Sequence, residues 1–162
     1  MSRRARVITI STRAAAGTWE DTSGPIIVAG LTDLGLQVDG PIVIPDGEQV
    51  EVELRRAVEE DLDLVMTTGG TGHTPRDLTP EFTRRVIERE SPGLAEAIRS
   101  HGVAKGVPTA VLSRGIAGIA KGTLIVNLPG SSGGARDGVA ALAPVLLHAI
   151  DQVRGGDHIR QG

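Results

Sequence analysis

Residues 61–81 read DLDLVMTTGGTGHTPRDLTPE, and three features follow one another in this stretch. The apolar run 62–66 has a length that suits a buried strand and is too short for a helix. The segment 67–72 places three glycines among small hydroxyl residues, so its backbone amides can approach a ligand without obstruction by Cβ atoms. A strand, a glycine loop, a charged turn and a helix are the parts from which an α/β sheet builds an anion site at its carboxyl edge.

The end of this stretch predicts the start of a helix. We expect Thr79 to be its N-cap and Pro80 its first residue, with the helix continuing through Arg89. Because Thr79 suits the cap, the helix does not need Asp77, and we expect the Asp77 carboxylate to serve a ligand rather than the turn. From the glycines alone, a tight connection without any ligand remains an alternative.

The common nucleotide-binding motifs do not match the glycine loop. A Walker A motif is excluded because no Gly-Lys-Ser/Thr follows. A dinucleotide fingerprint is excluded because Pro75 stands where Gly70-x-Gly72 would need a third glycine.

A different family does match. The sequence TTGGTGHTPRDLTPE at residues 67–81 resembles the signature of the molybdopterin-binding family of molybdenum cofactor biosynthesis proteins, the Mog/MoaB group and its plant G-domain relatives. Three further blocks are similar to this family and come in the same order: ITISTRAAAGTWEDTSGP at 8–25, IPDGE at 44–48 and LSRGIAGIAKGTLIVNLPG at 112–130. The four blocks span nearly the whole chain, which is therefore identified as a member of the family.

The composition indicates one globular domain with an aliphatic core. A chain of 162 residues predicts a single domain, residues 1–162. Trp19 and Phe82 are the only aromatic residues, so Val, Ile, Leu and Ala must fill the interior. Such side chains suit a parallel sheet covered by helices on both faces.

Charge and cysteine content exclude several classes of function. The net charge of −3, with no long run of one sign, argues against nucleic-acid or membrane-surface binding. The absence of cysteine excludes a disulfide framework, a thiolate zinc site and a cysteine nucleophile. The four histidines show no metal-ligand spacing. Because no signal peptide or membrane segment is visible, we expect a cytoplasmic protein.

Strands alternate with helices along most of the chain. We expect strands at 6–11, 38–44 and 62–66, and a β-hairpin of 115–120 with 123–128 joined by Lys121-Gly122. We expect helices at 25–34, 48–60, 80–89, 94–100 and 135–153, and a loose tail from Gly155 onward. Residues 109–114 fit either a helical turn or an extended piece. This order predicts a three-layer α/β/α sandwich with a mostly parallel sheet and an antiparallel edge strand or hairpin.

Four loops should gather at one edge of that sheet: 11–24, 45–48, 69–77 and 127–134. In the first loop, Trp19 either packs over a helix end or faces a ligand, and the neighbouring Glu20 and Asp21 favour the second interpretation. In the second loop, Asp46 follows a strand end, where an aspartate usually just bonds its own backbone. The position of Asp46 in the family-like IPDGE block implies a catalytic role instead.

The resemblance implies adenylyl transfer from ATP, with Mg²⁺ as the cofactor, to the terminal phosphate of molybdopterin with release of pyrophosphate. It implies that Asp46 and Asp77 are catalytic and hold the metal, since carboxylates are hard ligands and phosphoryl chemistry needs charge neutralisation. The implied substrate- and nucleotide-binding residues are Ser11, Asp21, Gly69, Gly70, Thr71, Gly72, Ser113, Asn127, Pro129, Gly130 and Ser131. Which loop binds the pterin and which binds AMP stays open.

Two other functions remain as alternatives: a non-catalytic molybdopterin carrier or scaffold, and a nucleotide-processing relative such as a pyrophosphatase. Intact Asp21, Asp46 and Asp77 favour the transferase, because a carrier needs no metal pair. The resemblance also implies a molybdenum-insertion protein as a partner and a homotrimer, with a hexamer as the alternative. The apolar stretch 115–128 favours assembly because it should leave a sheet edge that needs cover.

Overall fold

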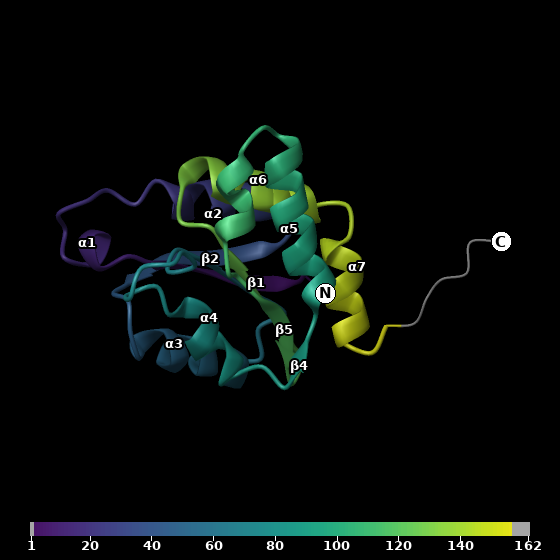
Figure 1. The fold of residues 1–162 in the computed structure, drawn as a ribbon. Helices are drawn as coiled ribbons and strands as arrows, with labels where there is room; N and C mark the ends of the chain where they lie inside the picture. Colours follow the sequence, from purple (N-terminus) through teal and green to yellow (C-terminus); the bar gives the residue numbers. More distant parts are fainter. Residues whose placement is uncertain (1, 157–162) are drawn as a thin grey trace.

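The computed structural model describes residues 2–156, which form a mixed sheet flanked by helices on both faces (Figure 1). The sheet has the order β2-β1-β3-β6-β5-β4. The strands are β1 (Arg4–Ile10), β2 (Gln37–Ile44), β3 (Leu64–Thr68), β4 (Arg89–Glu90), β5 (Ala117–Ala120) and β6 (Thr123–Leu128). The α-helices are α1 (Thr12–Ala15), α2 (Ser23–Asp33), α3 (Gln49–Glu59), α4 (Thr79–Arg84), α5 (Pro92–Ala104), α6 (Ser132–Leu142) and α7 (Leu146–Val153), and a 3-10 helix, η1, covers Pro108–Leu112.

The topology confirms the predicted mostly parallel sandwich. Strands β2, β1, β3 and β6 are parallel neighbours, whereas β5 runs antiparallel to β6 and β4 antiparallel to β5. The hairpin is also confirmed: Ala120 pairs with Thr123, and Lys121 in the connection has a φ of 52°. Because all four parallel strands point the same way, the loops after β1, β2, β3 and β6 lie at one edge of the sheet.

Two hydrophobic cores explain the three layers. Alternate residues of each central strand face opposite sides, so Leu64 and Met66 of β3 belong to one core and Val65 to the other. Side chains of α2, α5, α6 and α7 complete the first core. Side chains of α3 and α4 complete the second, and Figure 1 shows these two helices on the side of the sheet opposite α2 and α6.

Two predicted helices have different bounds in the structure. The helix expected at 80–89 ends at Arg84, and Arg89 lies in β4. Strand β4 pairs with β5, and β6 lies between β3 and β5. Both strands of the hairpin therefore have neighbours on each side, and the expectation that residues 115–128 leave an uncovered sheet edge is wrong. The helix expected at 135–153 is two helices, separated at 143–145 around Pro144, which has no N–H to donate and cannot sit in a helix interior. The predicted tail from Gly155 lies, from residue 157, outside the described residues.

The remaining sequence expectations are close to the observed bounds. The ambiguous segment 109–114 falls largely in the 3-10 helix η1. The loop 12–24 contains the short helix α1 and the start of α2. Within residues 2–156, no helix is both long and apolar enough to cross a membrane.

A charge cluster joins β1 to its neighbours away from the loop edge. The Arg6 side chain is 9% exposed and donates to Asp39 of β2 at 2.8 Å and to Glu60 at 2.7 Å. The hydrogen bond with Asp39, followed by that with Glu60, raises the pKa of Arg6 above its ordinary value. Correspondingly, the hydrogen bond from Arg6 lowers the pKa of Glu60. This cluster therefore helps fix β1, the strand whose carboxyl end leads into the candidate site.

Candidate active site

The glycine loop after β3 is pinned between the loops that follow β1 and β6. The Gly69 amide donates to Leu128 O at 3.2 Å, and the Thr68 hydroxyl donates to Pro129 O at 2.6 Å. Gly69 has a φ of 100°, and a Cβ there would collide with Ile10 O. Gly130 packs tightly against Gly69, because a Cβ on Gly130 would lie 3.1 Å from the Gly69 Cα. The two glycine-rich loops therefore touch backbone to backbone, which only bare glycines allow.

Four consecutive carbonyls of the glycine loop are bonded to the protein. Gly69 O accepts from the Thr79 hydroxyl at 3.0 Å, and Gly70 O accepts from the Thr79 amide at 3.1 Å. Thr71 O accepts from the Arg114 amide at 2.8 Å, and Gly72 O accepts from Arg114 Nε at 2.8 Å. Thr79 is consequently not the N-cap of α4, which is Leu78; its hydroxyl holds the glycine loop instead.

The opposite side of the same peptide groups is free to bind a ligand. A trans peptide points its C=O and its N–H in opposite directions, so the amides of residues 70–73 point away from the bonded carbonyls. None of these four amides has an acceptor among the described residues. Thr71 is only 5% exposed, and a buried N–H without a partner is unfavourable unless a ligand or water supplies one. Successive unpaired amides form a concave site for an anion.

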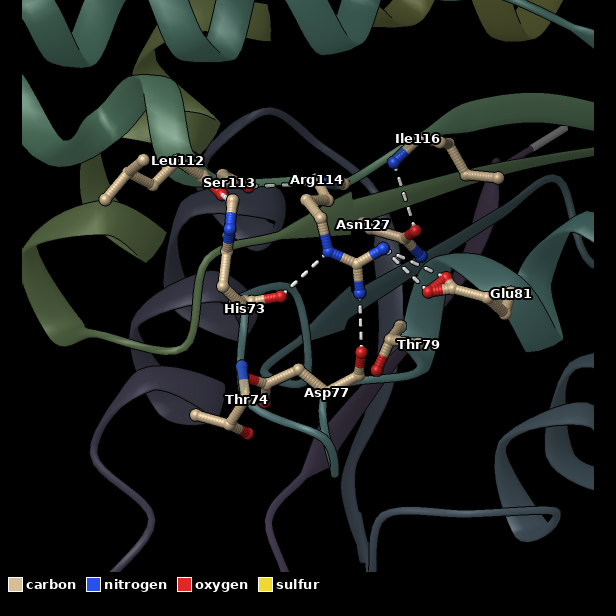
Figure 2. Close-up of polar contacts among 12 residues, drawn as sticks. His73, Thr74, Asp77, Thr79, Glu81, Leu112, Ser113, Arg114, Ile116 and Asn127 are labelled. Atoms are coloured by element: carbon tan, nitrogen blue, oxygen red, sulfur yellow. Dashed lines mark hydrogen bonds and ion pairs between the residues drawn. The ribbon is translucent and has the colours of Figure 1, made fainter.

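Arg114 connects this loop to helix α4 (Figure 2). Its Nη1 donates to the Glu81 carboxylate at 2.7 and 3.1 Å, and its Nη2 donates to Asp77 O at 2.6 Å. Together with the bond from Nε to Gly72 O, each of the three guanidinium nitrogens has a partner. Figure 2 shows the guanidinium between Glu81 and the loop, with Asp77 below it.

Two carboxylates border the glycine loop from different strands. A Cβ on Gly70 would lie 3.2 Å from Asp46 Oδ1, and a Cβ on Gly72 would lie 2.7 Å from Asp77 Oδ2. Asp46 Oδ2 accepts from the Thr12 hydroxyl at 2.8 Å, while Asp77 Oδ2 accepts from the Thr74 amide at 3.0 Å. The expectation that Asp77 has no part in its own turn is therefore wrong, because one of its oxygens closes residues 74–77.

The other carboxylate oxygens of this pair are available. Neither Asp46 Oδ1 nor Asp77 Oδ1 has a hydrogen-bond partner within residues 2–156. The same part of the chain contains no group of three or more His, Cys, Asp or Glu residues that could hold a metal ion. Two hard oxygens without a full protein cage suit Mg²⁺, which keeps waters and usually takes substrate phosphates as further ligands.

Two cavities meet at the glycine loops. The first, of about 520 Å³, is lined by 70–73, Asp77, residues of α5 and η1, and the start of α6. The second, of about 310 Å³, lies between the loop after β1 and the loop after β6. Gly130 and Ser131 line both cavities. A molecule in each cavity would therefore approach the other at this point.

The structure brings together most of the residues that the sequence singled out. The predicted residues that line the first cavity are Gly70, Thr71, Gly72, Asp77, Ser113, Pro129, Gly130 and Ser131. Those that line the second are Ser11, Asp21, Gly69, Gly130 and Ser131. Several of them also shape the loops: Ser11 caps α1, Asp21 accepts from the Gly24 amide at 3.0 Å, and Ser131 caps α6.

Asp46 and Asn127 line neither cavity. Asp46 lies beside the glycine loop, where its Oδ1 would be 3.2 Å from a Cβ on Gly70. The Asn127 side chain is 2% exposed; it donates to the hydroxyls of Thr67 and Thr83 and accepts from the Ile116 amide at 3.1 Å. Asn127 thus joins β3, α4 and the start of β5 beneath the loops.

Sequence reasoning missed other lining residues. Asp137 of α6 and Thr109 of η1 line the first cavity, and Thr22 lines the second. Trp19 and Glu20, for which the sequence favoured a loop facing a ligand, both line the second cavity; Trp19 is 62% exposed and has the Arg13 guanidinium 4.7 Å from its ring centroid. Asp137 could have been found only by placing the first two turns of α6 beside the glycine loop, because nothing in its local sequence marks it.

Comparisons with known proteins agree on one family. A family model described as "Probable molybdopterin binding domain" matches residues 6–148. "Molybdopterin adenylyltransferase" of Helicobacter pylori (strain J99) is 39% identical over 153 residues, which cover 92% of this chain and 86% of that protein. "Molybdenum cofactor synthesis protein cinnamon" of Drosophila melanogaster is 40% identical, but the match spans only 26% of its length. The solved Mog protein structure from Mycobacterium ulcerans matches 96% of this chain and 99% of its own, with a TM-score of 0.90 and 50% identity.

Proposed function

Because the chain belongs to the molybdopterin-binding family of molybdenum cofactor biosynthesis proteins, we propose that it transfers the adenylyl group of ATP to molybdopterin. The observation that carries the proposal is the glycine loop. Its four carbonyls are bonded inward, and its amides 70–73 are unpaired beside two cavities and two carboxylates. This arrangement supplies dipoles for phosphate oxygens without any covalent participation by the protein.

The proposed reaction is a nucleotidyl transfer. An oxygen of the terminal phosphate of molybdopterin forms a bond to the α-phosphorus of ATP, and the bond from that phosphorus to the bridging oxygen breaks. Pyrophosphate leaves with the electron pair of the broken bond. The products are adenylyl-molybdopterin and pyrophosphate. Such reactions depend on holding the two reactants in line and on stabilising charge, which is what two adjoining anion-binding loops can do.

Asp46 and Asp77 are the proposed Mg²⁺ ligands. Both are hard oxygen donors beside the same loop, and each has Oδ1 available while Oδ2 is held by Thr12 or Thr74. When bound, the cation would neutralise part of the triphosphate charge. The fixed Oδ2 atoms keep the two carboxylates oriented towards the loop, so little reorganisation is needed on binding.

The second glycine-rich loop supplies the other half of the proposed site. Ser131 caps α6 by accepting from the Gly134 amide at 3.0 Å, which leaves the amides of Ser132 and Gly133 in the first turn without acceptors among residues 2–156. A helix N-terminus of this kind favours a phosphate. Because Gly130 and Ser131 line both cavities, we place the transferred phosphate at this point, with one reactant in each cavity.

We propose further that residues 1–162 form one domain of a cytoplasmic homotrimer that hands its product to a molybdenum-insertion protein. A relative named "Molybdenum cofactor biosynthesis bifunctional protein" from Synechococcus elongatus, 37% identical and covered by this chain over 48% of its length, supports a partner in the same pathway. Apolar side chains on the outside of α5 and η1, away from both cavities, support assembly: Val103 is 44% exposed and Val111 is 60% exposed. Light scattering tests the assembly, and a stable monomer at micromolar concentration would contradict it.

Pyrophosphate release tests the proposed activity. We expect release only when molybdopterin, ATP and Mg²⁺ are all present, and a large loss of rate in Asp46→Asn. The matched control is Asp33→Asn, at the last residue of α2 and away from both cavities, which should keep the rate. Molybdopterin binding without pyrophosphate release would indicate the carrier instead. Pyrophosphate release from ATP alone would indicate the pyrophosphatase class.

A further inference from the structure

We propose that Arg114 is a positioning residue that holds the amides of the glycine loop towards the reacting phosphates. The inference rests on the proposed function and adds a role that belongs neither to the metal nor to substrate contact. Arg114 comes from the segment between η1 and β5, far from the loop in sequence. Yet its amide and its guanidinium together hold the carbonyls of Thr71, Gly72 and Asp77.

The peptide geometry links these bonds to the free amides. Each carbonyl that Arg114 holds fixes the direction of the next amide on the opposite side of the same peptide plane. Arg114 therefore sets the amides of Gly72 and His73, while Thr79 sets those of Gly70 and Thr71 through the two preceding carbonyls. Gly72 has an ordinary negative-φ backbone and could rotate its peptide if the carbonyl were released. The Thr71 carbonyl is held by the backbone amide of residue 114, which a substitution keeps, whereas the Arg114 side chain holds the Gly72 carbonyl and thereby orients the His73 amide.

The charge of Arg114 is directed away from the ligand. Its Nη1 donates to both oxygens of Glu81, which cancels most of the field of the guanidinium. Arg114 lines neither cavity, although its neighbour Ser113 lines the first. An arginine meant to bind phosphate would point its fork into the cavity, whereas this fork points at backbone oxygens and a carboxylate. The arrangement fits orientation and does not fit direct phosphate binding.

The bond to Asp77 O extends the same control to the proposed metal ligand. Asp77 follows a turn in which its amide donates to Thr74 O at 3.0 Å and its carboxylate accepts from the Thr74 amide. Arg114 Nη2 donates to the carbonyl oxygen of Asp77, at the end of this turn, at 2.6 Å. One side chain therefore couples the position of the amides to the position of the Asp77 carboxylate.

Arg114→Ala tests this role, with Arg84→Ala as the matched control. Arg84 also pairs with a glutamate, Glu90, but on the outside of α4, where the two side chains are 55% and 51% exposed. We expect Arg114→Ala to lower kcat about 100-fold with a smaller change in KM, because a misplacement of about 1 Å affects the transition state most. Added guanidinium should restore part of the rate. Arg84→Ala should stay within about twofold of wild type and show no response to guanidinium.

Two further measurements keep the inference falsifiable. Calorimetry with inorganic pyrophosphate as the probe should show binding about tenfold weaker in Arg114→Ala, independently of adenylyl transfer. If Arg114→Ala does not fold, Arg114→Lys replaces it, because an ammonium cannot reproduce the fork that joins Gly72 O, Asp77 O and Glu81. A full kcat in Arg114→Lys, or in Arg114→Ala, would overturn the role of Arg114. If the wild-type protein itself shows no adenylyl transfer, the proposed function is overturned instead.

Discussion

Gly70→Ala is the substitution that most clearly separates a ligand-binding loop from a simple turn. Gly70 has a φ of 67°, and a Cβ at this position would collide with the Thr79 hydroxyl and lie 3.2 Å from Asp46 Oδ1. The change therefore disturbs the Thr79 hydroxyl, which holds the Gly69 carbonyl, and one proposed metal ligand. It removes no side chain that could be catalytic.

The expected loss of stability has two parts. An alanine in the left-handed region costs roughly 1–2 kcal/mol. Displacing the Thr79 hydroxyl breaks its buried hydrogen bond to Gly69 O, which contributes about 1 kcal/mol. Together these lower the free energy of unfolding by about 2–3 kcal/mol. The matched control is Gly35→Ala: Gly35 has a φ of 92° but no atom within 4 Å of its Cβ position, so only the backbone contribution of about 1–2 kcal/mol applies.

Urea denaturation at equilibrium measures both variants, and pyrophosphate release measures their activity. We expect Gly70→Ala to be about 1 kcal/mol less stable than Gly35→Ala and to lose most of its activity, whereas Gly35→Ala keeps a normal rate. Equal destabilisation of the two variants together with normal turnover in Gly70→Ala would refute the reasoning. The loop would then be only a connection between β3 and α4.

Three other substitutions test the metal ligand, the charge cluster and the core. Asp77→Asn should lower adenylyl transfer about 100-fold and alter stability by about 0.5 kcal/mol or less, because the amide oxygen can still accept from the Thr74 amide; near-normal turnover at saturating Mg²⁺ would contradict this. Arg6 lowers the pKa of Glu60 from its ordinary 4.5, so the ion pair stabilises the fold above pH 4.5 and this stabilisation is lost as the pH falls through the lowered pKa. In Glu60→Gln, the free energy of unfolding should therefore decrease less steeply below pH 4.5 than in the wild type. If urea denaturation shows the same decrease in the free energy of unfolding below pH 4.5 in Glu60→Gln and in the wild type, the Arg6–Glu60 pair does not stabilise the fold. Leu64→Ala in the central strand should lower the free energy of unfolding by about 2–5 kcal/mol, because Leu64 is fully buried, and thermal unfolding measures it.

The fold was largely predictable because its signals are local. Short apolar runs that end in glycine or proline turns indicated the strands, and the Lys121-Gly122 pair indicated the hairpin. The errors occurred where tertiary contacts override local preference. Threonine is a residue type that often caps helices, but the Thr79 hydroxyl donates a hydrogen bond to Gly69 O instead. Arg89 continues a helical pattern, but its backbone pairs with β5.

The candidate site was predictable only in part. Glycine and proline patterns located the loops, since bare glycines are needed where two backbones touch. The supporting bonds could not be predicted, because they join distant segments: Arg114 reaches Gly72 and Glu81, and Asn127 reaches Thr67 and Thr83. The sequence within a few residues of Arg114 or Asn127 does not predict these hydrogen-bond partners.

We propose that the two cavities bring ATP and molybdopterin together for adenylyl transfer at the glycine loops. A single-turnover reaction with α-phosphate-labelled ATP, Mg²⁺ and molybdopterin, with enzyme in excess, tests this most directly. We expect the label to appear in adenylyl-molybdopterin in a one-to-one ratio with released pyrophosphate. Label that remains in ATP while molybdopterin is bound, or that appears in free AMP, would contradict it.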